Sequence, residues 1–167
     1  MTDVIVVSEL GQTLEFTFEE ALRYAGPHSP AGVAIGFKAL QSAFAALSPA
    51  GPPERRSVTV RTAFRGPGAR DAFEVVTRAV TEGRYVVDRA LLRADRGRLL
   101  EDFVFEVGLG GTTVTLLLRE GFVDDEFIDL ARTEPRTAAQ ESRLAALKIR
   151  LAQQVMATPA VDVFDVA

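Results

Sequence analysis

The first part of the chain alternates in a way that predicts two short strands and then a helix. Val4 to Val7 is a β-branched run, and a turn at Leu10-Gly11-Gln12 leads into a second extended segment, Thr13 to Phe16. Thr17-Phe18-Glu19-Glu20 has the residues of a capping box with acids in the first turn, which marks a helix start. We expect this helix to end at Gly26-Pro27, because glycine suits the C-terminal cap and proline cannot continue a helix.

The spacing of apolar residues then predicts two more helices with a strand between them. The second helix starts near Pro30 or Ala31 and runs to about Leu47, and Ser57 to Phe64 alternates as a strand does. A turn at Gly66-Pro67-Gly68 precedes the third helix. The buried stripes of the two helices are Phe37, Leu40, Phe44 and Leu47, and Phe73, Val76 and Val80.

The remaining pattern predicts strands and then a closing helix. Arg84 to Leu92, Phe103 to Leu109 and Thr112 to Arg119 have strand character, and Gly110-Gly111 between the last two predicts a hairpin turn. The segment Phe122 to Leu130 is ambiguous between helix and loop. A long amphipathic helix spans Arg136 to Met156, with Leu144, Leu147, Leu151 and Val155 on one face.

This order of elements predicts an α+β fold with helices packed on a mainly antiparallel sheet and a C-terminal helix. The length of 167 residues suits a single domain over 1–167. The helix Arg136–Met156 and the tail Val161–Val166 carry more apolar surface than one small domain readily buries, so we expect a homodimer.

Composition narrows the functional classes. The first residues carry an acid where a signal peptide needs positive charge, and no stretch approaches the roughly 18 apolar residues of a membrane span, so we expect a cytoplasmic protein that does not cross a membrane. A formal net charge of −4 and a pI near 5.1 argue against a nucleic-acid partner and favour small molecules or proteins as partners. The absence of cysteine excludes disulfides and iron–sulfur clusters, and one histidine cannot supply a structural zinc site.

The single histidine of the chain, His28, stands in a stiff turn, Gly26-Pro27-His28-Ser29-Pro30. Each proline fixes its own φ and restricts the residue before it, so the imidazole is held with little freedom. The helix that follows has Gly32 and Gly36 one turn apart. Two interpretations remain open for this face: another backbone packs closely against it, or the face admits a flat ligand.

This turn and helix resemble the first motif of the FmdE-type domain family of formylmethanofuran dehydrogenase, a Gly-His-x-Cys-Pro-Gly turn before Gly-x-Ala-x-Gly-x-Arg-Ala. Here Pro27-His28-Ser29-Pro30-Ala31-Gly32 and Gly32-Val33-Ala34-Ile35-Gly36-Phe37-Lys38-Ala39 stand at those positions. A second, weaker motif corresponds to Asp71 through Val80, followed by Gly83-Arg84. The resemblance covers about residues 15–120.

The resemblance implies an FmdE-like α+β core that dimerises, with a pocket beside the histidine. The family's cysteine positions are Pro30 and Ala79 here, so its thiolate metal site is lost. What remains implies a site centred on His28, as a catalytic residue with Asp71 or as an axial ligand to haem. Other residues implied at the pocket are Tyr24, Gly32, Gly36 and Thr77 for a cofactor, and Arg78, Arg84 and Tyr85 for a substrate.

Three functions stay open at this point, and whether the protein is an enzyme stays open with them. The leading prediction is a small-molecule or cofactor-binding protein, with haem as the most concrete ligand. The first alternative is a metal-free enzyme in which His28 acts as acid or base on a small anionic substrate, oriented by Asp71 or an arginine. The second is a structural or regulatory dimer whose site has decayed.

Overall fold

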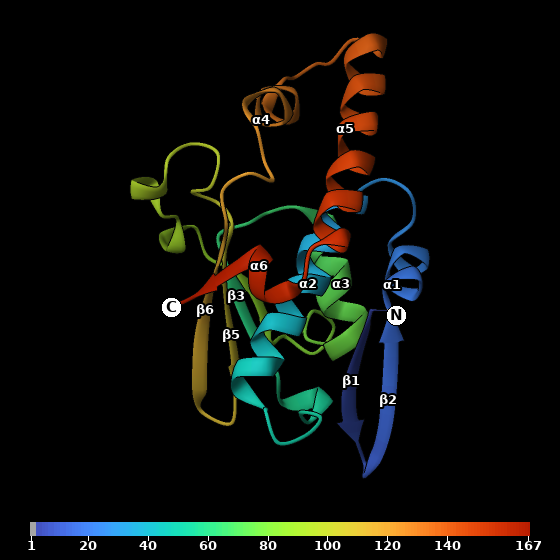
Figure 1. Cartoon of the computed structure of the whole chain (residues 1–167), viewed down its shortest axis with the longest axis vertical. Helices are drawn as coiled ribbons and strands as arrows, with labels where there is room; N and C mark the ends of the chain where they lie inside the picture. Colours follow the sequence, from blue (N-terminus) through green and yellow to red (C-terminus); the bar gives the residue numbers. More distant parts are fainter. Residues whose placement is uncertain (1–2) are drawn as a thin grey trace.

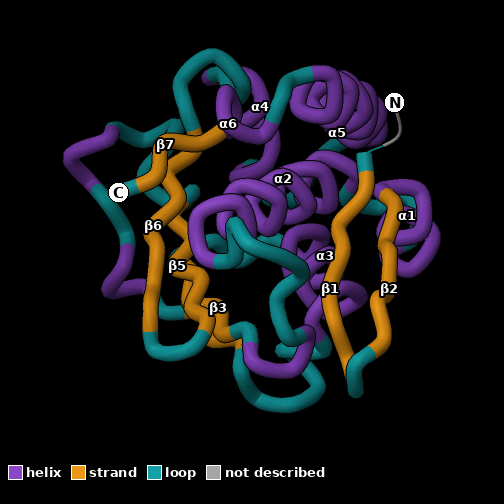
Figure 2. Tube along the Cα trace, turned by 60° about the horizontal axis from the view of Figure 1, so that its bottom comes forward, coloured by secondary structure: helices purple, strands orange, loops and turns teal. Residues whose placement is uncertain are grey.

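The computed structural model describes residues 3–167. The central helices lie between a five-stranded sheet and a two-stranded hairpin (Figure 1). Figure 2 shows the three layers, with α2 and α3 in the middle. The strands are β1 (Val4–Glu9), β2 (Gln12–Thr17), β3 (Thr59–Thr62), β4 (Tyr85–Val87), β5 (Val104–Leu109), β6 (Thr112–Leu118) and β7 (Phe164–Val166). The helices are α1 (Phe18–Ala25), α2 (Pro30–Leu47), α3 (Pro67–Thr77), α4 (Asp125–Arg132), α5 (Ala138–Ala157) and α6 (Ala160–Val163), with 3-10 turns at Arg55–Ser57, Arg89–Leu91 and Ala94–Arg96.

The larger sheet has the order β4-β3-β5-β6-β7, and all its pairs are antiparallel except β3 with β4. The predicted α+β class with a mainly antiparallel sheet is therefore confirmed. The hairpin turn between β5 and β6 is also confirmed, since Gly110 and Gly111 have φ of 59° and 84°. The strand predicted over Arg84–Leu92 is shorter, because the Asp88 side chain accepts a hydrogen bond from the Ala90 amide over 3.0 Å and starts a 3-10 turn.

Local capping explains where the predicted helices begin. The Thr17 hydroxyl accepts a hydrogen bond from the Glu20 amide over 3.1 Å, and the Glu20 carboxylate accepts one from the Thr17 amide over 3.2 Å. The same reciprocal arrangement joins Thr137 and Gln140 at the start of α5. These boxes satisfy amides that have no partner within the helix, which confirms the first helix and the long C-terminal helix.

The glycines of α2 permit close contact with α3. A Cβ added to Gly36 would lie 3.0 Å from the Cα and carbonyl oxygen of Ala69, and one added to Gly32 would lie 3.1 Å from the Cα of Gly68. The backbone of α3 therefore covers this face of α2. Close packing, the first of the two interpretations of the glycine pair, is confirmed, and at Gly36 it leaves no open face for a flat ligand.

The C-terminal third folds onto the rest of the chain. The ambiguous segment becomes α4, because the Asp124 side chain accepts a hydrogen bond from the Phe127 amide over 2.9 Å and caps the helix. In the tail, Val163 and Phe164 are 0% and 1% exposed, and β7 pairs with β6. Much of the apolar surface that the sequence suggested for a dimer thus belongs to the protein's own core.

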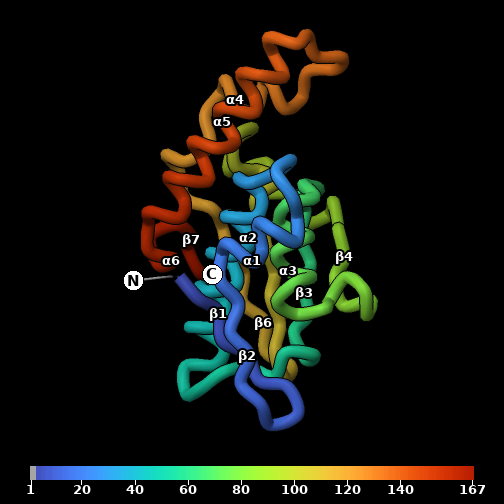
Figure 3. The backbone as a smooth tube through the Cα atoms, turned by 90° about the vertical axis from the view of Figure 1, so that its right-hand side faces the viewer, coloured from blue at the N-terminus to red at the C-terminus, as the bar shows by residue number. Residues whose placement is uncertain are grey.

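One part of the structure stands apart from the layers. Figures 1 and 3 show α4 and the first half of α5 extending beyond the body, with the connection between them at the tip.

Within residues 3–167, α2 is the one helix with the length and composition of a membrane span. Two-thirds of α2 (67%) is buried inside the protein, and the core helix of a non-membrane protein meets the same criteria.

Candidate functional site

A cavity of about 320 Å³ opens where the N-terminal ends of α2 and α3 meet α4 and α5. We call it the α2/α3 pocket. Its size lies near the lower end of the range for small-molecule sites. The apolar lining is Ala31, Phe64, Phe103, Phe127, Ile128 and Ala131; the charged or titratable lining is His28, Arg65, Asp102, Arg132 and Lys148; and Ser29, Gly32, Gly66, Pro67 and Gly68 complete the wall.

The aromatic wall comes from three separate segments. Phe64 and Phe103 stack with ring centroids 4.8 Å apart and planes inclined by 28°. Phe127 and the buried Ile128 are contributed by α4. This wall suits the face of a flat or aliphatic group.

The positive charge of the pocket is only partly compensated. Asp102 lies 3.0 Å from the Arg89 guanidinium and 3.9 Å from that of Arg132, so two arginines share this carboxylate. Lys148 and Arg65 have no acidic side chain within 4.0 Å among the described residues. Among residues 3–167, the Lys148 ammonium donates a single hydrogen bond, to the carbonyl oxygen of His28, over 3.2 Å. An anionic ligand would meet two cations that are not already neutralised.

Two helix starts add to this positive character. The Ser29 side chain makes no capping hydrogen bond at the start of α2, Gly66 has no side chain to cap α3, and neither helix has an acid in its first turn. The two starts touch, since a Cβ on Gly68 would lie 2.5 Å from the carbonyl oxygen of Ser29. Helix N-terminal amides and the helix dipole both favour negative charge.

Of the residues predicted for the site, the structure brings His28 and Gly32 to this pocket. The His28 side chain is exposed and lies at the pocket rim. Tyr24, in the last turn of α1, is 56% exposed and does not line the pocket. Gly36 lies one turn deeper in α2, against α3.

Thr77, Arg78 and Arg84 lie at the opposite end of α3, roughly 16 Å away along an 11-residue helix. Thr77 is fully buried, and its hydroxyl donates to the carbonyl oxygen of Phe73 over 2.6 Å. The Arg78 side chain pairs with Glu74 at 3.4 Å. The Arg84 guanidinium donates to the carbonyl oxygens of Thr77 (2.9 Å) and Val58, so it caps the C-terminal end of α3.

Asp71 and Tyr85 lie neither at the pocket nor at the C-terminal end of α3, but between α3 and β4. Asp71 lies 3.8 Å from Arg70, and the Tyr85 ring lies 5.7 Å from that of Phe73. The Tyr85 hydroxyl is buried without a hydrogen-bond partner. Burial raises the pKa of Tyr85 to about 12, an effect that Arg70 opposes and Asp71 supports. The single pocket expected around His28 and Asp71 is therefore not formed.

Sequence reasoning missed the residues that the C-terminal half brings to the pocket, above all Lys148, Asp102 and Arg132. Lys148 had one available signal, since it interrupts the apolar face of α5, four residues after Leu144 and three before Leu151, in a chain with only two lysines. Burial lowers the pKa of Lys148, and the nearby Arg136 lowers it further while Glu141 raises it. Asp102 and Arg132 follow no motif, and only the tertiary structure places them here.

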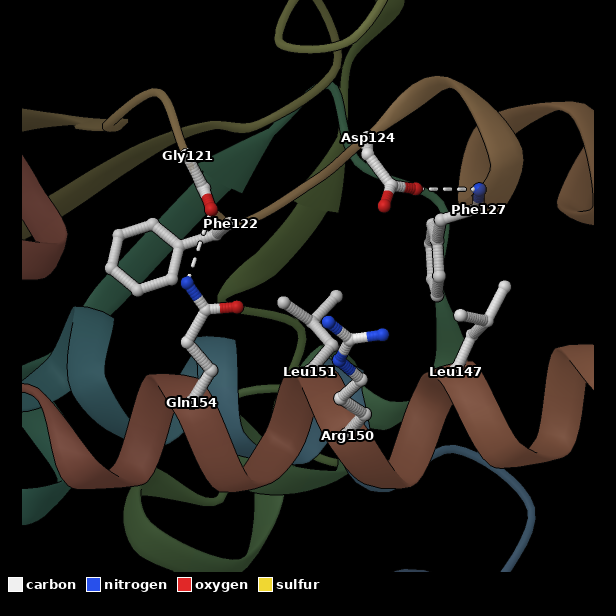
Figure 4. Close-up of a pocket in the computed structure, with 8 residues that line it drawn as sticks. All are labelled: Gly121, Phe122, Asp124, Phe127, Leu147, Arg150, Leu151 and Gln154. Carbon is white, nitrogen blue, oxygen red and sulfur yellow. Dashed lines mark hydrogen bonds between the residues drawn. The ribbon is translucent and has the colours of Figure 1, made fainter.

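A second cavity, of about 230 Å³, lies between α5 and the segment before α4 (Figure 4). The Gln154 amide donates to the carbonyl oxygen of Gly121 over 3.0 Å on one side of it. Arg150 points into the cavity and has no ion pair with a described residue. Phe127 lines both this cavity and the α2/α3 pocket, so the two cavities are neighbours.

Residues 3–167 contain no group of three or more histidine, aspartate or glutamate side chains arranged to hold a metal ion. No model of a known protein family matches the chain, and no curated protein sequence matches it. The resemblance to FmdE-type domains therefore rests on the two sequence motifs and stays a prediction.

Proposed function

We propose that the protein binds a small organic anion with an apolar body in the α2/α3 pocket, with His28 at the rim. The observation that carries this proposal is the Lys148 ammonium, which has no carboxylate partner and faces an apolar cavity. A buried or half-buried cation gains most from a partner that neutralises it, and none of the described side chains does so.

The polar end of such a ligand is best accommodated by Lys148, Arg65 and the starts of α2 and α3. These groups surround the same cavity, and the two helix starts lack side-chain caps. A carboxylate or a phosphate ester would satisfy them equally well, since both accept hydrogen bonds from ammonium, guanidinium and amide groups.

The apolar end is best accommodated by Phe64, Phe103 and Phe127. Haem belongs to this class of ligand, since it is flat, carries carboxylates and could take His28 as an axial ligand. A cavity of about 320 Å³ is small for a macrocycle and favours an acid with one ring. Haem is thus the less favoured member of the class.

A second candidate function is acid–base chemistry on the bound anion. The observation in its favour is that the only imidazole of the chain lies at the rim of this pocket. In this version the carboxylate facing the same cavity is Asp102 and not Asp71. Turnover of a bound acid that disappears in His28→Ala, with affinity retained, would identify this function.

A thermal-shift screen tests the binding proposal. Benzoate, phenyllactate and phenyl phosphate should raise Tm in proportion to the logarithm of their concentration, and the neutral analogue benzamide should not. Haem is added to a separate sample, where an absorption band that changes in His28→Ala would identify it as a ligand. Equal shifts with benzoate and benzamide, or none with any acid, would contradict an anion site.

A further inference from the structure

The use of lysine in this chain is selective. Of the 19 basic residues only two, Lys38 and Lys148, are lysines. Lys38 is 2% exposed and lies 3.4 Å from the Asp3 carboxylate, so it is buried and paired. Lys148 is the one lysine that lines a cavity among the described residues. In a chain that otherwise uses arginine for positive charge, a lysine at this position calls for a property that arginine lacks.

That property is a titratable, nucleophilic amine. A guanidinium stays protonated at all ordinary pH values, whereas an ammonium on a partly desolvated stem can lose a proton. Burial and the neighbouring Arg136 lower the pKa of Lys148. The cations Arg65 and Arg132 and the rim residue His28 face the same cavity, and Asp102 is the only carboxylate in its lining.

The geometry leaves the amine available. The Lys148 Nζ donates one hydrogen bond, to the carbonyl oxygen of His28, and a neutral amine can donate this bond as well as an ammonium can. No described carboxylate lies within 4.0 Å to hold the proton on the nitrogen. Its lone pair is therefore free, once the proton has left, to react with a group inside the pocket.

We propose that Lys148 forms a reversible imine with the carbonyl group of a 2-oxo acid. This inference rests on the proposed function, because it assigns a chemical class to the organic anion. The amine nitrogen attacks the carbonyl carbon, and the carbonyl oxygen leaves as water with the two hydrogens of the neutral amine. The C=O bond is replaced by a C=N bond, and no oxidant or reductant takes part.

A 2-oxo acid combines the features that the pocket selects. Its carboxylate is directly bonded to the reacting carbon, so the anion that the cations attract delivers the carbonyl group to the amine. An aromatic side chain on the next carbon would lie against Phe64, Phe103 and Phe127. We therefore choose phenylpyruvate as the probe, and phenyllactate, which has a hydroxyl in place of the carbonyl, as its matched control.

The test is trapping of the imine with borohydride, followed by peptide mass spectrometry. The full chain is incubated with phenylpyruvate and reduced, and adducts at Lys148, at Lys38 and at the α-amine are compared within one sample. We expect at least about tenfold more adduct at Lys148 than at Lys38, since a buried, ion-paired amine is a poor nucleophile. Excess phenyllactate should suppress the adduct at Lys148 and leave any adduct at the α-amine unchanged.

Calorimetric titration with phenyllactate separates the failure of this inference from that of the proposed function. If phenyllactate binds and phenylpyruvate gives no preferential adduct at Lys148, the imine is overturned and the anion site stands. An adduct that phenyllactate does not suppress would also overturn the imine, because the reaction would then take place outside the pocket. If phenyllactate does not bind and no adduct forms, both are wrong.

Discussion

The Lys148 ammonium of α5 donates a 3.2 Å hydrogen bond to the backbone carbonyl of His28, a residue 120 positions earlier in the chain. This contact joins the stiff turn before α2 to the projecting helical pair α4 and α5. It also fixes the position of a cation at the mouth of an apolar cavity. The proposed binding of an organic anion depends on that one relationship.

The first prediction concerns the close approach of α2 and α3. Gly36→Ala should lower the free energy of unfolding by about 1–3 kcal/mol, because the new methyl group would overlap with Ala69 and Ala72. Gly51→Ala is the matched control, since nothing lies within 4 Å of its added Cβ. Urea unfolding of both variants provides the measurement. A Gly36→Ala protein as stable as wild type would show that the helices are not in this contact.

Two arginines should separate stability from binding. Arg84→Met removes donors to the carbonyl oxygens of Thr77 and Val58, so we expect a loss of about 1–3 kcal/mol in unfolding free energy and an unchanged affinity for phenyllactate. Arg65→Met should weaken binding and leave stability nearly unchanged, because Arg65 is exposed and lines the pocket. The reverse pattern would restore Arg84 to the substrate site predicted from the sequence.

The buried hydroxyl of Tyr85 predicts a pH dependence of stability. Its pKa is raised to about 12, so the folded state keeps a proton that the unfolded state loses near pH 10. The free energy of unfolding is therefore unaffected by this group below pH 10 and falls as the pH rises from 10 toward 12, by up to about 2 kcal/mol. Tyr85→Phe should be about 1 kcal/mol more stable near pH 7, because it removes an unpartnered buried hydroxyl.

Unfolding curves of wild type and Tyr85→Phe at pH 8 and near pH 11 measure this effect. The stability difference between the two proteins should widen at the higher pH. A difference that is constant with pH would mean that the hydroxyl finds a partner or reaches solvent.

A fourth prediction concerns the wall of the pocket that α4 supplies. Arg98 pairs with both Asp125 and Asp129 and ties α4 to the segment before β5, while all three side chains are solvent-exposed. Exposed ion pairs contribute little to global stability, so Arg98→Ala should leave the unfolding midpoint nearly unchanged. Amide hydrogen exchange in Asp125–Arg132 should nevertheless become faster, because local opening depends on these few contacts. Unchanged exchange would show that packing on α5 and the ion pairs of Arg132 with Glu101 and Asp102 hold α4 without Arg98.

Much of the fold could be predicted because its signals are local. Capping residues at Thr17, the Gly26-Pro27 stop and the Gly110-Gly111 turn each act within a few residues, and each is confirmed. The β3–β4 pairing and the return of the tail as β7 were not predicted, because they join distant segments. Strand pairing of this kind is decided by packing and not by local propensity.

The candidate site divides in the same way. The turn at His28 and the start of α2 follow from prolines in the sequence, and the structure places both at the pocket. The second motif suggested that Asp71, Arg78 and Arg84 would join them. Because α3 enters the pocket only by its N-terminal end, residues farther along α3 lie elsewhere, and Lys148 takes their place from a helix 120 residues away. The spacing of residues along the sequence does not predict that Lys148 reaches this pocket.

The central claim is that the Lys148 ammonium binds an organic anion, and isothermal titration with phenyllactate tests it most directly. Lys148→Met removes the charge and keeps most of the apolar stem, and Arg150→Met removes the same charge two positions along α5, at the other cavity. We predict that Kd rises about tenfold or more in Lys148→Met and changes by less than about twofold in Arg150→Met. Equal affinity in wild type and Lys148→Met would contradict the claim.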